Sequence, residues 1–532
     1  MATNKVLEIL FFIKKAMEDF VSKFKDRIIG VQQGFDHILI KGYIRDFQID
    51  QRFNYYICKE GYLLKTYKNF VLKKRDELKL HIDKTAEETG CYREFITSHK
   101  REQLDIAKEL VAKNPEKEGL ICILSSIEPC YSTTVRKNAK SGMLERRYEP
   151  RKCTHHYFYY NDREFGIMYV KLQSWLPYTI NIYINGKEYL KRQLEKKGIK
   201  YSSYNNSITS VEDMNKAQKI SDKFIEKKWY TVFDVFAKRI NIFTKEIEEI
   251  LGRAAYSWCM DYSEYATDIL FKDRESLTEI YPKLVEYASL CQGGENIYTF
   301  FGKKLHGNAT GEAVSDRKNY WEQGFRVKFA MNKNSIKMYD KDSVLRIETT
   351  INNSRAFKIH TQGKWLPMGK SISNMYRIAE ISKKCNERYL NSLAVLNCNT
   401  NIDKEIESLC HTKTTKLTSK ISDCKPRPYG AFNLLRDSTC KLFNTLMNGA
   451  YSITGFTRKE ITQSLINIKA FKTSELNNMK KLVGKVTRLL AKLRAHGLIT
   501  MYPKTFKYRV TQKGQEIISR ILLFKKMDII VV

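Results

Sequence analysis

The feature that most constrains the fold is a series of β-forming segments in the second hundred residues. Residues 119–127 (GLICILSSI) form a nearly continuous apolar run, which is typical of a buried strand. Residues 155–160 and 166–172 flank a turn and predict a hairpin. Residues 178–184 predict a third strand, closed by the tight-turn pair Asn185-Gly186. Strand and helix patterns alternate along residues 1–120, so we expect a mixed α/β body.

Length and charge set the class of protein. The chain has 532 residues, enough for three or four domains of roughly 150 residues each. Hydrophobic residues make up 42%, which predicts large cores and excludes a disordered basic tail. Lys and Arg number 93 against 59 Asp and Glu, a net charge of +34, which predicts a polyanionic partner. An AT-rich genome is the alternative explanation for part of the lysine excess.

The predicted architecture is an α/β body, made of a mixed sheet plus helices, with a helical insertion and a C-terminal winged-helix domain. Residues 398–430 are polar and end in a Pro-containing segment, which predicts a linker. The expected boundaries are 1–200 for the α/β domain, 205–320 for the helical region, 321–397 for a β-hairpin and helix completing the body, 398–430 for the linker, and 431–532 for the winged helix.

The C-terminal fifth of the chain concentrates the positive charge. Residues 425–532 contain 21 Lys and Arg against 5 Asp and Glu, a net +16 that genome bias does not predict. A first helix is expected over 432–447, and Thr457 to Glu460 forms a capping box that opens a second. A third helix is expected over 476–496, with Gly497 stopping it before a β-hairpin over 498–511.

The segments LLAKLRAHGLI and KYRVTQKGQEI within this region resemble the recognition helix and wing of bacterial winged-helix proteins. The resemblance implies that the third helix enters the major groove of duplex DNA and that the wing touches its backbone. A winged helix used for protein contacts is the alternative. The basic residues expected to bind nucleic acid are Lys480, Lys481, Lys485, Arg488, Lys492, Lys504, Lys507 and Arg509.

Carboxylates at the ends of predicted strands are the candidate catalytic groups of the body. Asp36 begins one strand, and Glu128 directly follows the run at 119–127. Nucleases and transposases of the ribonuclease-H type use such carboxylates to hold Mg²⁺ or Mn²⁺, which activates water and stabilises the leaving oxygen. We therefore predict Asp36 and Glu128 as metal ligands and catalytic residues. Surface acids that merely end strands are the alternative.

A second catalytic candidate is the predicted hairpin over 335–348. Its Tyr339-Asp-Lys341 and Arg346-Ile-Glu348 are similar to the Y-x-K…R-x-E hairpin of plasmid rolling-circle replication initiators. This similarity implies Tyr339 as a nucleophile, with Glu348 as a further carboxylate. The His-hydrophobe-His metal motif of related nicking enzymes is absent, because His155 and His156 are adjacent. A cross-strand ion pair on a sheet face is the alternative.

Cysteine usage leaves a zinc site open. Cys122, Cys130, Cys153 and His155 lie close in sequence, although structural zinc usually shows tighter paired spacings and buried cysteines are the default. No C-x-x-C and no secretory signal occur, so we expect reduced thiols and a cytoplasmic protein. No run of 18 apolar residues occurs, so no membrane span is expected.

The segments LSSIEPC, RKCTHHYFYYNDREFGIMYVKLQSW and NSIKMYDK resemble a family of uncharacterised bacterial multidomain proteins that end in a winged helix. The resemblance implies the architecture and carries no reaction with it. We expect a nucleic-acid-binding protein of mobile-element type that cleaves or transfers DNA strands with a metal ion. A non-catalytic transcription or replication regulator and an RNA-processing or defence nuclease are the alternatives. The sequence leaves the oligomeric state open.

Overall fold

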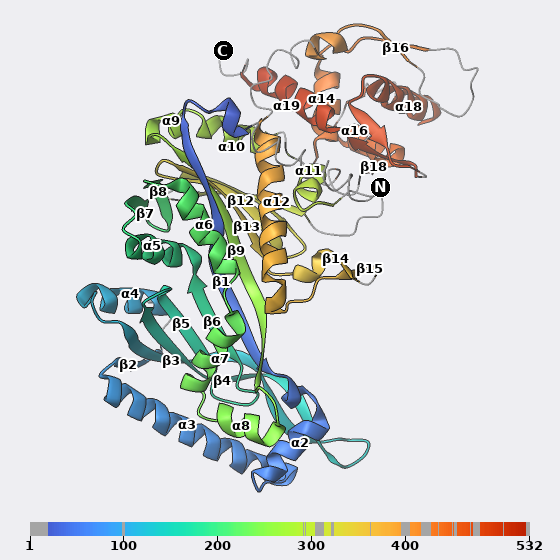
Figure 1. Cartoon of the computed structure of the whole chain (residues 1–532). Helices are drawn as coiled ribbons and strands as arrows, with labels where there is room; N and C mark the ends of the chain where they lie inside the picture. Colours follow the sequence, from blue (N-terminus) through green and yellow to red (C-terminus); the bar gives the residue numbers. More distant parts are fainter. Residues whose placement is uncertain are drawn as a thin grey trace. The chain divides into compact units, whose positions relative to one another are not determined.

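The structure is a computed structural model. It describes residues 20–97, 102–290, 292, 294–303, 313–320, 324–361, 363–394, 405–415, 427–434, 436–448, 451, 455–468, 470–471, 479–503 and 505–527. The chain forms two compact units. Figure 1 labels their helices and strands. The central unit comprises residues 30–270 and 348–383, and the terminal unit comprises 1–29, 271–347 and 384–532. Neither unit is a single stretch of sequence, whereas the sequence predicted consecutive domains.

A mixed sheet organises the central unit, as predicted. Its strands lie in the order β13-β9-β1-β6-β5-β4-β3-β2. They are β1 (Ile28–Ile44), β2 (Tyr92–Phe95), β3 (Gly119–Lys137), β4 (Leu144–Asp162), β5 (Gly166–Gln173), β6 (Ile180–Asn185), β9 (Tyr256–Phe271) and β13 (Val344–Ile351), of which residues 348–351 belong to this unit. β2 and β3 are parallel, and each pair from β3 through β4, β5 and β6 to β1 is antiparallel. Two small hairpins, β7 (Tyr201–Tyr204) with β8 (Ser207–Val211) and β14 (Lys358–Thr361) with β15 (Lys364–Pro367), stand outside this sheet.

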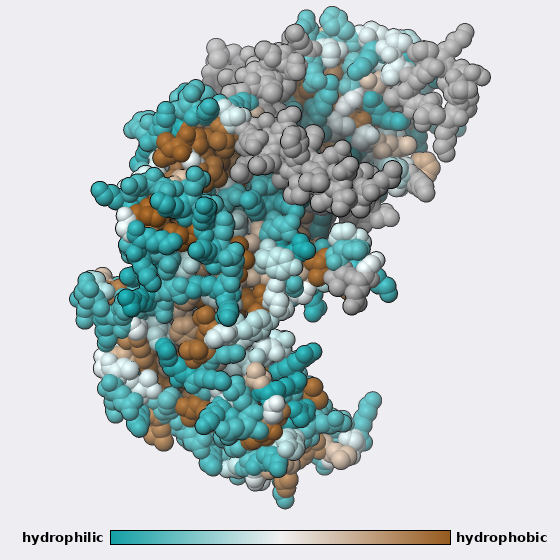
Figure 2. All heavy atoms as spheres, in the orientation of Figure 1, coloured by the Kyte–Doolittle hydropathy of each residue, from teal (hydrophilic) through white to brown (hydrophobic). Residues whose placement is uncertain are grey.

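Helices cover both faces of this sheet. They are α2 (Asp50–Lys59), α3 (Tyr67–Thr89), α4 (Gln103–Lys113), α5 (Gly186–Lys196), α6 (Met214–Ile225), α7 (Trp229–Ile240), α8 (Thr244–Leu251) and residues 375–383 of α12 (Met375–Ala394). Tyr159 packs against α4, and the next residue of β4, Tyr160, packs against Phe236 of α7. Because neighbouring side chains of a strand point to opposite faces, α4 and α7 lie on opposite sides of the sheet. The surface over α5 and α6 is mainly hydrophilic (Figure 2).

The predicted strand that ends at Ile127 is longer than expected. β3 continues through Glu128 and Pro129 to Lys137, paired throughout with β4. Among the described residues, β2 pairs with β3 only from Cys122 to Ser125, so no described strand pairs with that edge of β3 where the proline lies. Proline is tolerated on such an edge because its missing N–H is not needed there. The prediction that Glu128-Pro129 ends the strand is therefore wrong.

The pair Asn185-Gly186 starts a helix and does not form the predicted tight turn. The side chain of Asn185 accepts hydrogen bonds from the backbone N–H groups of Lys187 and Glu188, at 2.9 and 3.1 Å. This is the N-cap geometry of α5. A Cβ on Gly186 would lie 2.2 Å from the carbonyl oxygen of Phe35, so only glycine lets the helix start so close to β1.

The predicted helical region over 205–320 contains a long strand. β9 occupies Tyr256–Phe271, between α8 and α9 (Arg274–Thr278). Every residue from Ser263 to Phe271 is buried, which matches a strand covered on both faces. Such a strand has no alternation of polar and apolar residues, and this is why the sequence pattern did not reveal it.

The terminal unit carries its own strands and helices. They are α9, α10 (Tyr281–Leu290), α11 (Gly294–Phe300), β10 (Ala313–Tyr320), β11 (Gly324–Met331), β12 (Asn334–Lys341), β16 (Lys413–Thr415), β17 (Arg427–Tyr429), α14 (Asp437–Leu446), β18 (Phe456–Thr457), α16 (Arg458–Asn467), α18 (Met479–Ala495), β19 (Ile499–Met501), β20 (Lys507–Val510) and α19 (Gln512–Met527). β11 pairs antiparallel with both β10 and β12. The turn of the predicted hairpin over 335–348 lies at Asp342-Ser343, between β12 and β13, and Asp342 has a φ of +54°. The predicted linker contains strand pairing, since β16 pairs with β17.

The predicted C-terminal helices and hairpin are present. Thr457 and Glu460 form the capping box at the start of α16. Gly497 follows α18 with a φ of +74°, and β19 and β20 then pair antiparallel. A shared core of residues from α14, α16, α18 and α19, including Phe443, Leu490 and Ile517, joins these elements. β18 completes a small sheet in the order β18-β20-β19.

Two expectations from the sequence concern membrane-spanning helices and the state of the cysteines. Within the described ranges, no helix is both long and apolar enough to cross a bilayer. The nine described cysteines are free thiols.

Candidate metal centre

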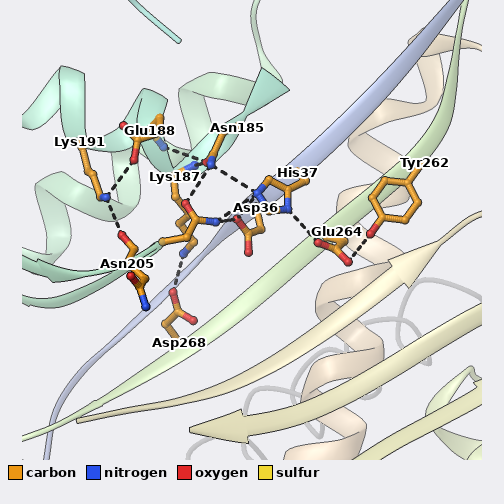
Figure 3. A network of polar contacts seen from close by, with 11 residues as sticks. Asp36, His37, Asn185, Lys187, Glu188, Lys191, Asn205, Tyr262, Glu264 and Asp268 are labelled. Atoms are coloured by element: carbon orange, nitrogen blue, oxygen red, sulfur yellow. Dashed lines mark hydrogen bonds and ion pairs between the residues drawn. The ribbon is translucent and has the colours of Figure 1, made fainter. Parts of the chain in front are cut away.

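Three potential ligands meet where β1 lies beside β9 in the central unit. Asp36 and His37 come from β1, and Glu264 comes from β9 (Figure 3). His37 Nδ1 lies 3.0 Å from Glu264 Oε2, and His37 Nε2 lies 3.5 Å from Asp36 Oδ1. Asp36 and Glu264 are buried, while the His37 side chain is 27% exposed. The imidazole therefore bridges two buried carboxylates.

Two asparagine amides complete the surroundings of His37. The amide nitrogen of Asn206 donates to Asp36 Oδ1 and lies 3.4 Å from His37 Nε2. The amide nitrogen of Asn185 lies 3.4 Å from the same ring nitrogen and donates to Asn206 Oδ1 at 3.0 Å. Asn185 therefore both caps α5 and faces His37, so the start of this helix is tied to the centre.

The position of Asn206 follows from the tight hairpin between β7 and β8. Asn205 occupies the left-handed region with a φ of +51°, a conformation that asparagine tolerates better than most residues. Its carbonyl oxygen accepts a hydrogen bond from Lys191 of α5 at 2.9 Å. This contact holds the turn against α5 and places the next residue, Asn206, over Asp36.

A buried ion pair lies next to the centre. Lys187 of α5 donates to Asp268 Oδ2 of β9 at 2.7 Å, and both side chains are 1% exposed. The same ammonium group donates to the side-chain oxygen of Gln32 on β1. These contacts join α5, β1 and β9, and so fix the elements that carry Asn185, Asp36 and Glu264.

The electrostatics of the centre favour a positive charge. Burial opposes protonation of His37, but the charge of Asp36 and the hydrogen bond to Glu264 outweigh it, and the pKa of His37 is raised. Burial and the Glu264 carboxylate raise the pKa of Tyr262, whose hydroxyl donates to Glu264 Oε1. The Glu348 carboxylate, buried on β13, adds to both shifts. A cation at this position is therefore surrounded by negative charge.

These residue types can hold a divalent metal. One atom each from Asp36, His37 and Glu264 lies within 4.8 Å of the others. Carboxylate oxygens suit Mg²⁺ and Mn²⁺, and an imidazole ligand shifts the preference toward Mn²⁺ and later transition metals. A metal ion would take the place of the proton on His37, because a ligating imidazole must be neutral.

The predicted carboxylates divide into two groups. The pKa of Tyr262 is raised mainly by burial and by Glu264. Asp36 and Glu348 also raise it, so these two carboxylates lie in the same neighbourhood. Glu128 lies on β3, four strands across the sheet from β1, which is roughly 19 Å. It accepts from Lys171, Tyr157 and Ser126 at 2.5, 2.7 and 2.8 Å. The structure therefore does not bring Glu128 and Asp36 to a common ion.

Tyr339, the predicted nucleophile, belongs to the terminal unit, whereas Asp36 and Glu348 belong to the central unit. Its side chain is 8% exposed, and the Lys341 ammonium lies 5.5 Å from the centre of its ring. The predicted Arg346 is fully buried on β13.

Sequence reasoning missed His37 and Glu264. His37 directly follows Asp36 in the predicted strand. Two adjacent residues that can both bind a metal were therefore the available signal. Glu264 gave no such signal, because its segment was expected to be helical. The two residues are 227 positions apart, and only the order of β9 and β1 in the sheet brings them together.

A cleft of about 510 Å³ opens near the other end of β1 in the same unit. Lys41 and Tyr43, which line it, share a strand face with His37 by the period-two rule. Arg146, Tyr148 and Lys370 also line it. Arg146 pairs with Asp50 at 2.6 Å and Lys370 pairs with Asp261 at 3.0 Å. The cleft therefore combines basic and aromatic groups.

The predicted nucleic-acid-binding residues differ in their surroundings. Lys480, Lys481 and Arg488 are exposed on α18. Lys485 and Lys492 lie over the rings of Phe471 and Phe432, at 5.3 and 4.0 Å from the ring centres. Lys507 and Arg509 are half-buried in β20. Lys504 lies outside the described residues.

Comparison with models of protein families, with curated proteins and with solved structures finds no match to this chain.

Proposed function

We propose that this protein binds nucleic acid and cleaves or transfers its strands with a divalent metal ion held by Asp36, His37 and Glu264. The observation that carries the proposal is the approach of these three ligand atoms to within 4.8 Å of one another. Glu348, whose charge reaches His37, is the candidate for a further ligand or for a base. The proposed ion is Mn²⁺ or Mg²⁺.

The chemistry would rest on the metal and on the charges around it. A bound divalent ion lowers the pKa of a coordinated water and neutralises charge on the leaving oxygen of a phosphodiester. The surrounding carboxylates hold the ion, and the two asparagine amides orient Asp36 and His37. Lys187 is already paired with Asp268, so we assign it a positioning role and not a catalytic one.

The charge and the central unit's surface support a nucleic-acid substrate. The net charge of +34 favours a polyanion. On the β3–β4 hairpin, the rings of Tyr131 and Tyr148 lie 5.3 Å apart, and these side chains are 55% and 50% exposed. Exposed aromatic pairs beside arginines can stack bases. Tyr148 also lines the cleft that shares a strand face with His37.

The C-terminal elements support targeting to duplex DNA. Three helices followed by a short hairpin, with β18 added to the sheet, are the elements expected of a winged helix. In this proposal α18 enters the major groove and the β19–β20 hairpin contacts the backbone. Phe506, at 90% exposed the most exposed large apolar side chain of the described residues, lies in that hairpin and faces the same ligand.

A non-catalytic regulator is the second candidate function. The observation that favours it is that His37 already has two carboxylate partners, so the cluster can serve as a structural ion-pair network without a metal. An RNA-processing nuclease is a third, which would use the Tyr131–Tyr148 pair for single strands. All three bind nucleic acid, and they differ in metal binding and in cleavage.

The first test is metal binding by the full-length protein. Mn²⁺ is titrated and followed by electron paramagnetic resonance, with Asp36→Asn and Glu264→Gln as variants. We expect each variant to weaken Mn²⁺ binding by at least roughly tenfold. Glu128→Gln is the matched control, because that carboxyl lies four strands away, and it should keep the wild-type affinity.

The second test is strand cleavage on labelled duplex DNA, single-stranded DNA and RNA. Cleavage that needs Mn²⁺ or Mg²⁺ and is lost in Asp36→Asn supports the metal centre. An adduct that survives denaturation and disappears in Tyr339→Phe would instead support a tyrosine nucleophile, since a phenol that attacks phosphate stays attached to the cut end. Salt-dependent binding without cleavage on any substrate would leave the regulator.

A further inference from the structure

A second cluster of metal-ligating side chains lies on the β3–β4 hairpin of the central unit. The sulfur atoms of Cys130 and Cys153 are 3.2 Å apart. One ligand atom from each cysteine and one from His155 all lie within 4.8 Å of one another. Cys153 and His155 share a face of β4 because they are separated by one residue. The strand register pairs Glu128 with Cys153, so Cys130 reaches Cys153 diagonally across the two strands.

One ring nitrogen of His155 has a backbone partner. His155 Nδ1 lies 3.3 Å from the carbonyl oxygen of Cys153, so this nitrogen can donate its hydrogen and leave Nε2 with a lone pair. Metal-binding histidines usually donate their other ring N–H to such a partner, which fixes the tautomer.

The other two members of the sequence cluster lie elsewhere. Cys122 is fully buried and packs against α4 with Ile106. His156 points to the opposite face of β4 from His155, and its Nδ1 lies 2.8 Å from the Ser125 hydroxyl. The four-residue zinc hypothesis over Cys122, Cys130, Cys153 and His155 is therefore narrowed to three ligands.

We propose that Cys130, Cys153 and His155 bind a zinc ion whose fourth position is open to solvent. Thiolates and a neutral imidazole are the ligands that select zinc over the oxygen-preferring Mg²⁺. With Zn–S bonds of about 2.3 Å, tetrahedral geometry places two sulfurs roughly 3.8 Å apart. The observed 3.2 Å would open by about half an ångström, which two rotating side chains can supply. Three protein ligands leave one position for water or another small ligand.

This site is independent of the proposed Asp36 centre. It lies on β3 and β4, whereas Asp36 and Glu264 lie on β1 and β9. Its ligands are soft, whereas the Asp36 centre is dominated by carboxylates. Loss of the cysteines should therefore remove zinc and leave Mn²⁺ binding unchanged, and the two proposals can fail separately.

The experiment measures metal content and ligand type on untagged full-length protein. Zinc is added, excess is removed by dialysis, and zinc per chain is determined by elemental analysis. We expect Cys130→Ser and Cys153→Ser to bind one zinc fewer per chain than wild type and the control Cys58→Ser, whose thiol is exposed on α2. Loss of a group that only hydrogen-bonds a metal ligand typically weakens metal binding by roughly 10- to 100-fold. His155→Gln removes a ligand itself, so it should weaken zinc binding by more than this.

Cobalt substitution of the wild-type protein keeps the test valid if a serine variant fails to fold. Co²⁺ bound by thiolates gives an intense sulfur-to-metal charge-transfer band, which an oxygen site does not give. Absence of that band, or equal zinc in wild type and in folded cysteine variants, overturns the proposal. A Cys130–Cys153 disulfide found by peptide mapping of wild-type protein without zinc also overturns it.

Discussion

Lys187 of α5 and Asp268 of β9 form an ion pair at 2.7 Å although each side chain is only 1% exposed. Two charges removed from water in this way stabilise the fold only while both are present. The pair lies next to the Asp36 centre, because the same ammonium group bonds Gln32, four residues before Asp36. The precision of the centre therefore depends on a contact that takes no part in its proposed chemistry.

Removing one partner of this pair should be strongly destabilising. Asp268→Asn leaves the Lys187 ammonium buried without its counter-charge, and we expect the free energy of unfolding to fall by about 3–5 kcal/mol. Urea unfolding followed by circular dichroism measures the loss. The double variant Lys187→Met with Asp268→Leu should recover part of it, because both charges of the pair are then removed together. A double variant that loses the sum of both single effects would contradict this account.

Gly186→Ala should disturb the start of α5. The added Cβ would lie 2.2 Å from the Phe35 carbonyl oxygen, so the helix must move away from β1. We expect a loss of about 1–3 kcal/mol in unfolding free energy and weaker Mn²⁺ binding, since Asn185 moves with the helix. Gly484→Ala in α18 is the matched control: a Cβ there meets nothing within 4 Å, so stability should stay equal or rise.

Asp46 should make stability depend on pH in the acid range. Burial opposes its charge, but hydrogen bonds from Arg253 and Arg52 outweigh this and lower its pKa. The folded state then binds fewer protons than the unfolded state, whose Asp pKa is about 3.9. The contribution is complete above that value and is lost as the pH falls through the lower, folded pKa.

Asp46→Asn should therefore cost about 1.5–3 kcal/mol at neutral pH, and the difference from wild type should shrink below about pH 4. Urea unfolding at a series of pH values tests this. Asp76→Asn is the control, because that side chain is 61% exposed and pairs with its neighbour Arg75, so little change is expected. A difference in unfolding free energy between Asp46→Asn and wild type that grows toward acid pH would refute the assigned sign.

Duplex DNA binding should depend on the exposed face of α18. Replacing Lys480, Lys481 and Arg488 by glutamine removes up to three positive charges that would neutralise phosphates. The slope of log affinity against log salt should then become shallower by roughly 0.9 for each phosphate that is no longer neutralised. Lys245→Gln, an equally simple charge removal on α8 of the central unit, should leave the slope unchanged. Equal slopes in the triple variant and wild type would exclude α18 as the DNA-binding element.

The parts of the fold that sequence could predict are those with a local signature. The hairpin of β4 and β5 follows from two β-forming runs around a short turn. The start of α16 follows from the capping box of Thr457 and Glu460, and the end of α18 from Gly497. In each case the deciding interactions lie within a few residues of one another, so composition and spacing contain them.

The parts that sequence could not predict depend on strand order. Asp36 was identified as a candidate, but Glu128 was chosen as its partner because both were expected at strand ends. Glu128 instead lies within β3, and Glu264 lies in the half of β9, from Ser263 to Phe271, that is buried on both faces and shows no alternation. Nothing local distinguishes the correct carboxylate, since only β9 lying next to β1 brings it to His37.

The candidate metal centre is assembled from segments that are widely separated along the chain. Asp36 and His37, Asn185, Asn206, Glu264 and Glu348 come from five different elements or turns, and residues of the other unit are interposed before Glu348. A protease cut or a truncation anywhere between Asp36 and Glu348 would break the covalent connection between residues of the centre. A bound ion would stabilise all of these segments together. Limited proteolysis should therefore cleave the connecting loops more slowly in the presence of Mn²⁺ than in its absence.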